Sequence, residues 1–314
     1  MGCFVFATKV KSYAKVNLSL NILGQKDGYH LIDSVAASVD IWDTLVLRKR
    51  RDKLVNVYMH GKGSEGIPFA SNNAVRAAEL FCAAFGTRGV DAEVYKDIPM
   101  GAGLGGSSAD AAGILRGMAK LYGVDPARLP ALAAQLGSDT VYMLEGGFAR
   151  LTGRGEKVER LSSPRRYHML LIFPKASVST PACFAEYDKN PDPLRADSAR
   201  MAQAVAAGDF SRVAENVYNA LGAPACALEP EVGEALEFAR SLSPSACAVT
   251  GSGSAVFALF EAEELCRWAK SRCRKFESRV VHTVDGTKRK NTMRNPFVLS
   301  EEEVEEARGE RAED

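Results

Sequence analysis

The stretch Pro99-Met100-Gly101-Ala102-Gly103-Leu104-Gly105-Gly106-Ser107-Ser108-Ala109-Asp110-Ala111-Ala112 decides the fold, because four glycines and two serines lead straight into a helix-forming segment. Glycine permits positive φ and close approach of a ligand to backbone N–H groups, and the first turn of a helix offers unpaired donors at its positive end. We expect the helix from Ala109 to about Leu121, with Ser107 or Ser108 as its N-cap. The stretch therefore predicts a phosphate-binding loop.

Two other phosphate-binding patterns compete with this interpretation. A Walker loop is excluded, because no lysine follows Gly106. Gly101, Gly103 and Gly106 satisfy the dinucleotide pattern Gly-x-Gly-x-x-Gly, but Asp125, the candidate ribose-binding acid, lies between two helical stretches rather than at the end of a strand. A dinucleotide oxidoreductase and a tight turn without a ligand stay open as weaker alternatives, since four glycines and two serines exceed what a turn requires.

Composition limits the classes of partner. The net charge of +1 over 314 residues gives no general attraction to nucleic acid or to acidic membranes, so we expect neither of those partners. The oligomeric state stays unknown. No apolar run is long enough to span a bilayer, and the N-terminal apolar run reaches Lys9 too early for a signal peptide.

Cysteine and histidine usage bears on compartment and metals. The seven cysteines are odd in number and scattered, which favours a reducing, cytoplasmic location. The four histidines are isolated along the sequence and show no metal-ligand spacing, so no metal cluster is expected and any metal ligands are unknown.

Hydrophobic periodicity predicts an α+β sandwich with an antiparallel sheet covered on one face. Strands are expected over 9–23, 35–46, 54–59, 90–95, 140–144, 148–161 (a pair), 167–173, 246–260 (a pair) and 279–284. Helices are expected over 73–85, 109–121, 128–136, 197–206, 210–221, 231–242 and 261–276. We predict a boundary near residue 160 and a charged, mobile tail from about Lys288.

Three segments carry a family resemblance. The run 96–112 resembles the ATP loop of the GHMP kinases (galacto-, homoserine, mevalonate and phosphomevalonate kinases). The run 14–20 with Asp27-Gly28-Tyr29-His30, and the run 250–257, resemble two further motifs of this family, in the family's order. The resemblance implies a two-domain GHMP kinase fold: a ribosomal-protein-S5-like, ATP-binding domain over 1–160, a ferredoxin-like domain over 161–287, and a tail over 288–314.

The N-terminal segment 14–20 and the late segment 250–257 are most similar to one branch of the family, whose members act on a small-molecule substrate. That branch uses ATP and Mg²⁺ to phosphorylate the 2-hydroxyl of a cytidine diphosphate-linked methylerythritol in the non-mevalonate isoprenoid precursor pathway. A GHMP kinase acting on another small alcohol, of the homoserine or mevalonate type, is the alternative. A nucleotide-binding protein without catalysis is a third hypothesis.

The resemblance also implies roles for individual residues. Asp139 matches the family's general base and Lys15 the lysine that holds it; taken alone, they read equally well as a helix cap and a surface charge. The implied nucleotide-binding residues are Asn72, Lys96, Pro99, Gly101, Gly103, Leu104, Gly105, Gly106, Ser107 and Ser108. The implied substrate-binding residues are Asn17, Tyr29, His30, Thr180, Phe184, Gly251, Ser252 and Gly253.

The chain departs from the family pattern at two places. Ser107 replaces the third glycine of the loop and must accept the backbone angle of that position, and Ala109 replaces the second serine. After Asp139, Thr140 and Val141 replace the family's valine and proline. Without the proline the turn is less rigid, so the positioning of the base depends on other contacts. No acidic Mg²⁺ ligand is evident, which leaves phosphates, water and a loop serine to hold the ion.

Overall fold

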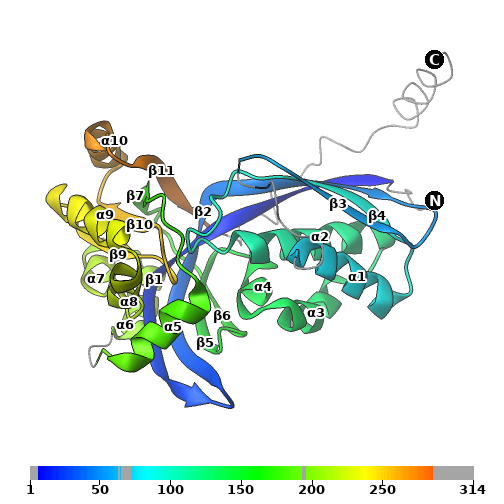
Figure 1. Ribbon diagram of the computed structural model, residues 1–314, viewed down its shortest axis with the longest axis horizontal. Helices are drawn as coiled ribbons and strands as arrows, with labels where there is room; N and C mark the ends of the chain where they lie inside the picture. Colours follow the sequence, from blue (N-terminus) through cyan, green and yellow to red (C-terminus); the bar gives the residue numbers. More distant parts are fainter. Residues whose placement is uncertain (1–5, 63, 65–71, 193–195, 286–314) are drawn as a thin grey trace.

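The computed structural model describes residues 6–62, 64, 72–192 and 196–285 of the chain. A long antiparallel hairpin, formed by β1 (Ala7–Lys26) and β2 (Tyr29–Lys49), runs through the whole molecule (Figure 1). The hairpin turns at Asp27 and Gly28, both at positive φ. Every other part of the fold is arranged around it.

Strand β2 joins the two halves of the molecule. Along its free edge it pairs first with β5 (Phe148–Gly153), then with β11 (Glu277–Val284) and finally with β4 (Val90–Tyr95), all antiparallel. Strand β6 (Lys157–Leu161) extends this sheet beside β5, and β3 (Val55–His60) lies parallel to β4. Because β11 also pairs with β7 (His168–Phe173), one continuous sheet crosses both halves.

Four α-helices cover the first half on one face of its sheet (Figure 1). They are α1 (Asn73–Phe85), α2 (Gly106–Tyr122), α3 (Leu129–Leu136) and α4 (Ser138–Met143), with a 3₁₀ turn, η2, at Pro126–Arg128. Helix α2 lies closest to the hairpin, since a Cβ at Gly113 would come within 2.8 Å of the Leu45 side chain. The glycine therefore allows the close helix–sheet approach that buries nearly the whole of α2.

The second half has its own antiparallel sheet, in the order β11-β7-β10-β9, with β9 at Ala246–Val249 and β10 at Val256–Phe260. Its helices are α5 (Thr180–Lys189), α6 (Ser198–Ala207), α7 (Phe210–Glu215), α8 (Gly222–Leu228), α9 (Pro230–Ser241) and α10 (Glu263–Arg272). A two-residue strand, β8 (Tyr218–Asn219), adds to β1. The α+β fold in two parts is confirmed, whereas the predicted domain boundaries stay a prediction.

Two secondary-structure predictions were wrong. Residues 140–144, expected as a strand from their β-branched and aromatic content, begin inside α4, where Thr140, Tyr142 and Met143 are buried against the neighbouring helices. The helix expected over 210–221 ends at Glu215, because the chain turns to pair β8 with β1. In both places tertiary packing overrides local propensity. Helices α5 and α8 were not predicted, and the predicted tail lies outside the described residues.

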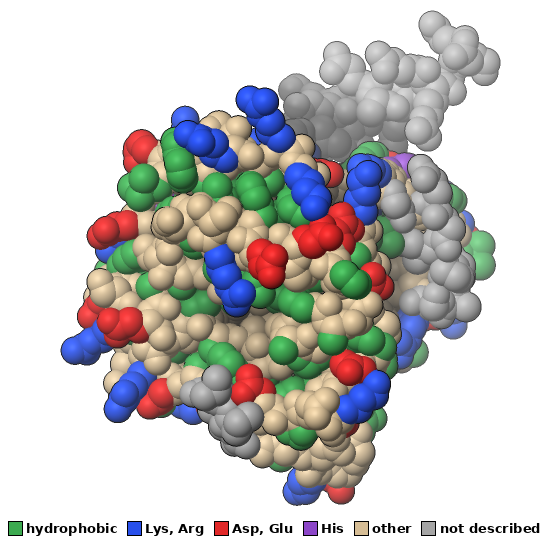
Figure 2. Space-filling view, turned by 60° about the vertical axis from the view of Figure 1, so that its left-hand side comes forward, with side chains coloured by type: hydrophobic (Ala, Val, Ile, Leu, Met, Phe, Trp, Pro, Cys, Tyr) green, Lys and Arg blue, Asp and Glu red, His purple; other side chains and the backbone are tan. Residues whose placement is uncertain are grey.

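Basic and acidic side chains are intermixed over the face turned forward in Figure 2, with apolar side chains between them. No helix in the part of the chain that the structure describes is both long and apolar enough to cross a membrane.

Candidate active site

The glycine loop places an uncapped helix N-terminus in the middle of the molecule. Gly101, Gly103 and Gly105 have φ values of 67°, 72° and 73°, in the left-handed region that glycine favours. Helix α2 begins at Gly106, with Gly105 as its N-cap and no side chain capping it, so the predicted serine caps were wrong. The first amides of α2 therefore lack an intrahelical acceptor and a side-chain acceptor. The N-terminus of α2 has the chemistry of an anion site.

Ser107 takes the place of the family's third glycine without strain. It lies within the first turn of α2 and is not among the described residues at positive φ. Its hydroxyl accepts a hydrogen bond of 2.9 Å from the Asn73 side chain at the start of α1. The substitution thus ties α1 to α2 instead of distorting the loop.

The glycine-containing segment 250–255, between β9 and β10, packs against the glycine loop. A Cβ at Gly103 would lie 2.2 Å from the carbonyl oxygen of Thr250, so only glycine fits there. The amide of Ser254 donates to the carbonyl of Gly101 (3.3 Å), and that of Ala255 donates to Ala102 (3.2 Å). These contacts fix the loop from the β9–β10 connection.

The N-terminal motif approaches the same loop from β1. The amide of Lys15 donates to the carbonyl of Leu104 (3.0 Å), and the amide of Asn17 donates to the hydroxyl of Thr250 (3.0 Å). The three segments that the sequence singled out therefore meet around the N-terminus of α2, although they are far apart along the chain.

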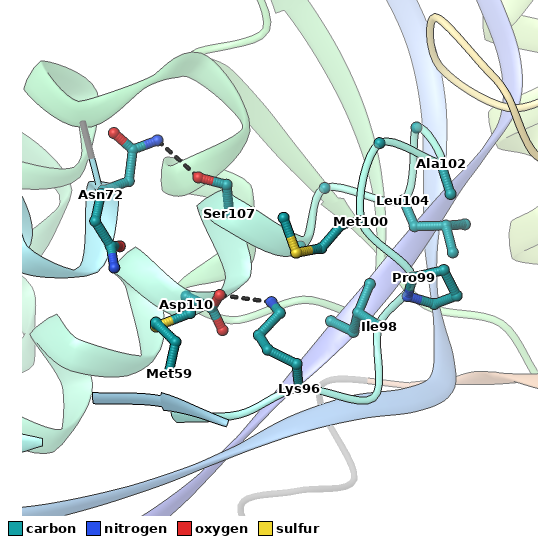
Figure 3. Close-up of a pocket in the computed structure, with 15 residues that line it drawn as sticks. Met59, Asn72, Lys96, Ile98, Pro99, Met100, Ala102, Leu104, Ser107 and Asp110 are labelled. Atoms are coloured by element: carbon teal, nitrogen blue, oxygen red, sulfur yellow. Dashed lines mark hydrogen bonds and ion pairs between the residues drawn. The ribbon is translucent and has the colours of Figure 1, made fainter. Parts of the chain in front are cut away.

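A pocket opens beside the loop (Figure 3). Its walls are the loop itself, the N-terminus of α1 and the side chains of Met59, Lys96, Ile98 and Asp110, with Met100 at 47% exposure on the rim. Of the predicted nucleotide-binding residues, Asn72, Lys96, Pro99, Gly101, Gly103, Leu104, Gly105, Gly106 and Ser107 line it, and Ser108 lies next to them in α2. Asn72 also caps α1, accepting from the Ala74 amide at 2.9 Å.

Lys96 forms a buried triad with Asp43 and Asp110. Its ammonium donates to Asp43 Oδ2 at 2.5 Å and to Asp110 Oδ2 at 2.6 Å, and the three side chains are at most 4% exposed. Burial raises the pKa of Asp110 to about 8. The Lys96 charge acts to lower this pKa, and repulsion from Asp43 acts to raise it. The two carboxylates raise the pKa of Lys96 against the opposing effect of burial. The ammonium is thus committed to these carboxylates within the described structure.

Lys15 forms a more open cluster on the other side of the loop. Its Nζ donates to Asn17 Oδ1 at 2.6 Å and lies 3.4 Å from Asp139 Oδ2. The Lys15 side chain is 6% exposed and that of Asp139 is 35% exposed. Asp139 is in the first turn of α4, whose buried Tyr142 hydroxyl donates to the Gly147 carbonyl at 2.6 Å. Packing of α4 therefore positions Asp139 without the family's proline.

The tip of the β1–β2 hairpin and α5 form an aromatic cluster. The His30 ring stacks on Phe184, with centroids 4.5 Å apart and an interplanar angle of 25°. His30 Nε2 lies 2.8 Å from Asp188 Oδ1, and the Gln25 amide donates to Asp188 Oδ2 at 2.9 Å. Tyr29 points to the opposite face of the strand and lies under the Arg154 guanidinium at 4.4 Å. The structure thus brings His30 and Phe184 together but not Tyr29.

The remaining predicted substrate residues meet at the start of α5. The hydroxyls of Thr180 and Ser252 are 2.8 Å apart. Gly251 and Gly253 flank Ser252 and lie against Gly103 of the loop. The segment 250–254 therefore contacts both the glycine loop and α5.

Sequence reasoning missed three carboxylates of the site. Asp43 and Asp110 bind the Lys96 ammonium, and Asp188 contacts His30. A signal for Asp43 was present. It lies two residues from both Ile41 and Leu45 in a strand, so it shares the face of these two buried side chains and had to point into the core. Asp110 is likewise flanked by buried alanines in α2. Asp188 carried no such signal, since it lies on an exposed part of α5.

The comparisons with known proteins agree with this geometry. Residues 72–149 match the family model of the GHMP kinases N terminal domain, and residues 201–274 match that of the GHMP kinases C terminal domain. A crystal structure of 4-(cytidine 5'-diphospho)-2C-methyl-D-erythritol kinase superposes with a TM-score of 0.73 at 31% identity, over 88% of this chain and 99% of that one. The fold is that of a GHMP kinase.

Curated relatives of the chain indicate which kinase family within the GHMP kinases it belongs to. The 4-diphosphocytidyl-2-C-methyl-D-erythritol kinase of Caldicellulosiruptor saccharolyticus is 33% identical over 93% of this chain and 99% of its own length. The enzyme of that name from Pelotomaculum thermopropionicum is 35% identical over 86% of this chain and 95% of its own. The chain belongs to the 4-diphosphocytidyl-2-C-methyl-D-erythritol kinase family. Homoserine kinase from Cytophaga hutchinsonii has a TM-score of 0.71 at 19% identity, which shows a shared fold.

Proposed function

We propose that this enzyme, a small-molecule kinase, transfers the γ-phosphoryl group of ATP to the 2-hydroxyl of 4-diphosphocytidyl-2-C-methyl-D-erythritol. One observation carries the proposal: the N-terminus of α2 is uncapped at the point where Lys15 and Asp139 approach it from one side and the pocket opens on the other. Such an arrangement suits a triphosphate whose terminal group faces a polar, protonatable pair.

The glycine loop is assigned to the phosphates of ATP. The amides at the start of α2 supply donors and a positive dipole end without side-chain charge. Asn72 and the apolar side chains of Met59 and Ile98 line the same pocket and are assigned to the nucleoside. Lys96 contributes to the potential of this wall, but its ammonium is held by Asp43 and Asp110 and reaches a phosphate only by leaving them.

Asp139 is assigned as the general base. Its carboxylate is accessible enough to accept the proton of a bound alcohol, and the Lys15 ammonium lies 3.4 Å from it. Lys15 is fixed in turn by Asn17, whose own amide nitrogen donates to Ser34 at 2.8 Å. This chain of contacts orients the pair toward the end of the loop.

The acceptor is assigned to the surface between the hairpin tip and α5. Phe184 offers a stacking face, and His30 with Asp188 offers polar atoms that can read the edge of a pyrimidine. Thr180, Ser252 and the backbone of Gly251 and Gly253 lie between this cluster and the glycine loop and are assigned to the diphosphate. If a pyrimidine base were stacked between Phe184 and Tyr29, the Tyr29 ring would have to leave the Arg154 guanidinium.

Mg²⁺ would neutralise charge on the transferring phosphates. The fit rests on the hydroxyls of Ser107 and Ser108 at the start of α2, beside the pocket. Mg²⁺ keeps several waters and needs only one or two protein ligands, so this donor set is sufficient. The six cysteines that the structure describes are free, which suits the reducing cytoplasm in which we place the reaction.

A substrate panel tests the proposal. Purified enzyme with Mg-ATP is offered 4-diphosphocytidyl-2-C-methyl-D-erythritol, homoserine and mevalonate in separate reactions, and ADP release is measured. We expect ADP only with the cytidine compound, and phosphate on its 2-hydroxyl by NMR. Turnover of homoserine or mevalonate alone would assign another acceptor. Saturable ATP binding with no ADP above an Asp139→Asn control would instead indicate a nucleotide-binding protein without catalysis.

A further inference from the structure

A second cluster of chemistry-bearing side chains lies in the second half of the molecule, among residues that do not line the pocket. His168 is the first residue of β7, His282 is near the end of β11, and Glu263 opens α10. The two histidines are direct partners in the β7–β11 pairing, so the sheet register brings them together across more than a hundred residues of sequence. Spacing along the sequence gave no sign of this cluster, because the two histidines come together only through strand pairing.

The donor atoms converge. One ligand atom from each of His168, Glu263 and His282 can be chosen so that all lie within 4.8 Å of one another. The imidazole rings meet edge to face, with centroids 4.9 Å apart and an interplanar angle of 88°. His168 Nδ1 is a buried nitrogen without a hydrogen-bond partner in the described structure, and His282 Nε2 makes no hydrogen bond of good geometry although it lies 3.0 Å from Glu263 Oε2. Buried polar atoms are normally satisfied, so the unpartnered nitrogen of His168, close to a second imidazole and a carboxylate, favours an occupant.

The outer atoms of the ligands are already held. His282 Nδ1 lies 3.1 Å from Asp40 Oδ2, and a proton donated there leaves Nε2, 3.0 Å from Glu263 Oε2, as the lone-pair donor to an ion. Glu263 Oε1 accepts two hydrogen bonds from Arg267, at 3.0 and 2.6 Å, so Oε2 remains for a ligand. A carboxylate behind a metal-binding histidine is the usual second shell of a zinc site.

We propose that His168, His282 and Glu263 bind one divalent transition-metal ion, with Zn²⁺ as the best fit. Two imidazoles and one carboxylate are a donor set that Zn²⁺ binds with a fourth position left to water. Ligands at about 2.0–2.1 Å around a tetrahedral ion lie ~3.4 Å apart, so the side chains close by on the order of 1 Å on binding.

The bound ion would fasten α10 to the β7–β11 pair, and through Asp40 to β2. In Figure 1 these elements come together at the upper left, where β11 crosses between the two halves of the sheet. Occupancy of the site is therefore expected to raise the thermal stability of the protein.

The experiment uses full-length protein stripped of metal by a chelator and then titrated with Zn²⁺ against a chromophoric competitor. Co²⁺ serves as a spectroscopic probe of the same site. We expect one equivalent of tightly bound Zn²⁺, a rise in melting temperature on binding, and a tetrahedral Co²⁺ spectrum without the charge-transfer band of a thiolate ligand. Absence of stoichiometric binding, or a thiolate spectrum from the cysteines, overturns the proposal.

Variants assign the ligands. Glu263→Gln is mild, because residue 263 lies at a partly exposed helix start, and it is expected to weaken Zn²⁺ binding by about 10-fold or more; Asp40→Asn is expected to weaken it by about 10–100-fold through His282. His282→Gln should abolish binding and the stabilisation together. The matched control is His60→Gln, since His60 also faces a carboxylate, Glu93 at 3.7 Å, outside the cluster. Equal affinity in wild type, Glu263→Gln and His282→Gln would refute the assignment.

Discussion

Two lysine–carboxylate clusters flank the N-terminus of α2 and differ in one respect. A Cβ at Gly105 would lie 3.2 Å from Cγ of Lys15, and one at Gly106 would lie 3.5 Å from Nζ of Lys96, so the two lysines approach the same turn. Both lysines are almost completely buried, but the carboxylate beside Lys15 is 35% exposed, whereas those beside Lys96 are 0% and 4% exposed. Exposure of the partner therefore distinguishes the pair that we propose for proton transfer from the buried triad.

The largest effect expected from this difference is catalytic. Asp139→Asn preserves shape and removes the proton acceptor, so kcat should fall by about 10²–10⁴-fold while the KM for ATP stays within a few-fold of wild type. Steady-state ADP release measures this, with the melting temperature as the control for folding. A kcat within ten-fold of wild type would remove Asp139 from the role of base.

The second effect concerns stability. Lys96→Met leaves Asp43 and Asp110 buried without their counter-charge, which should lower the free energy of unfolding by about 3–5 kcal/mol. Lys15→Met should cost clearly less, because Asp139 can be solvated where it stands. Denaturant unfolding of both variants measures the difference. Equal losses would show that the exposure of the partner does not distinguish the clusters.

The remaining effect is a pH dependence of stability. The pKa of Asp110 is raised from 3.8 to about 8, so the folded state binds this proton more tightly than the unfolded state. The stabilisation is complete below about pH 4 and is lost as the pH rises toward about 8, with a slope of at most about 1.4 kcal/mol per pH unit. Asp110→Asn, which cannot ionise, should lack this component, so unfolding curves of the two proteins should diverge in favour of the variant as pH rises. Parallel pH profiles would contradict the shifted pKa.

The glycine loop and the helix after it could be predicted from the sequence because their physical requirements are local. Glycines at positive φ and a following apolar helix lie within one short stretch, and the structure has them there. The N-cap was misplaced, since Ser107 and Ser108 looked like capping residues and the chain uses Gly105 instead. A local pattern fixes the existence of an element better than its first residue.

Features that depend on pairing between distant segments could not be predicted in this way. The meeting of His168 and His282 follows from the β7–β11 register, and the partners of Lys96 come from β2 and α2. Asp188 reaches His30 only because α5 lies beside the hairpin tip. The family resemblance implied which residues would matter, but not the carboxylates that hold them.

The pairing of β11 with both β7 and β2 has a consequence for the growing chain on the ribosome. Strand β7 ends at Phe173 and β11 begins at Glu277, so about 100 residues are synthesised before one edge of β7 acquires its neighbour. Until then that edge presents unsatisfied backbone groups beside largely buried apolar side chains, the kind of surface that recruits strands from other molecules. Nascent protein therefore exposes an aggregation-prone strand edge until β11 emerges.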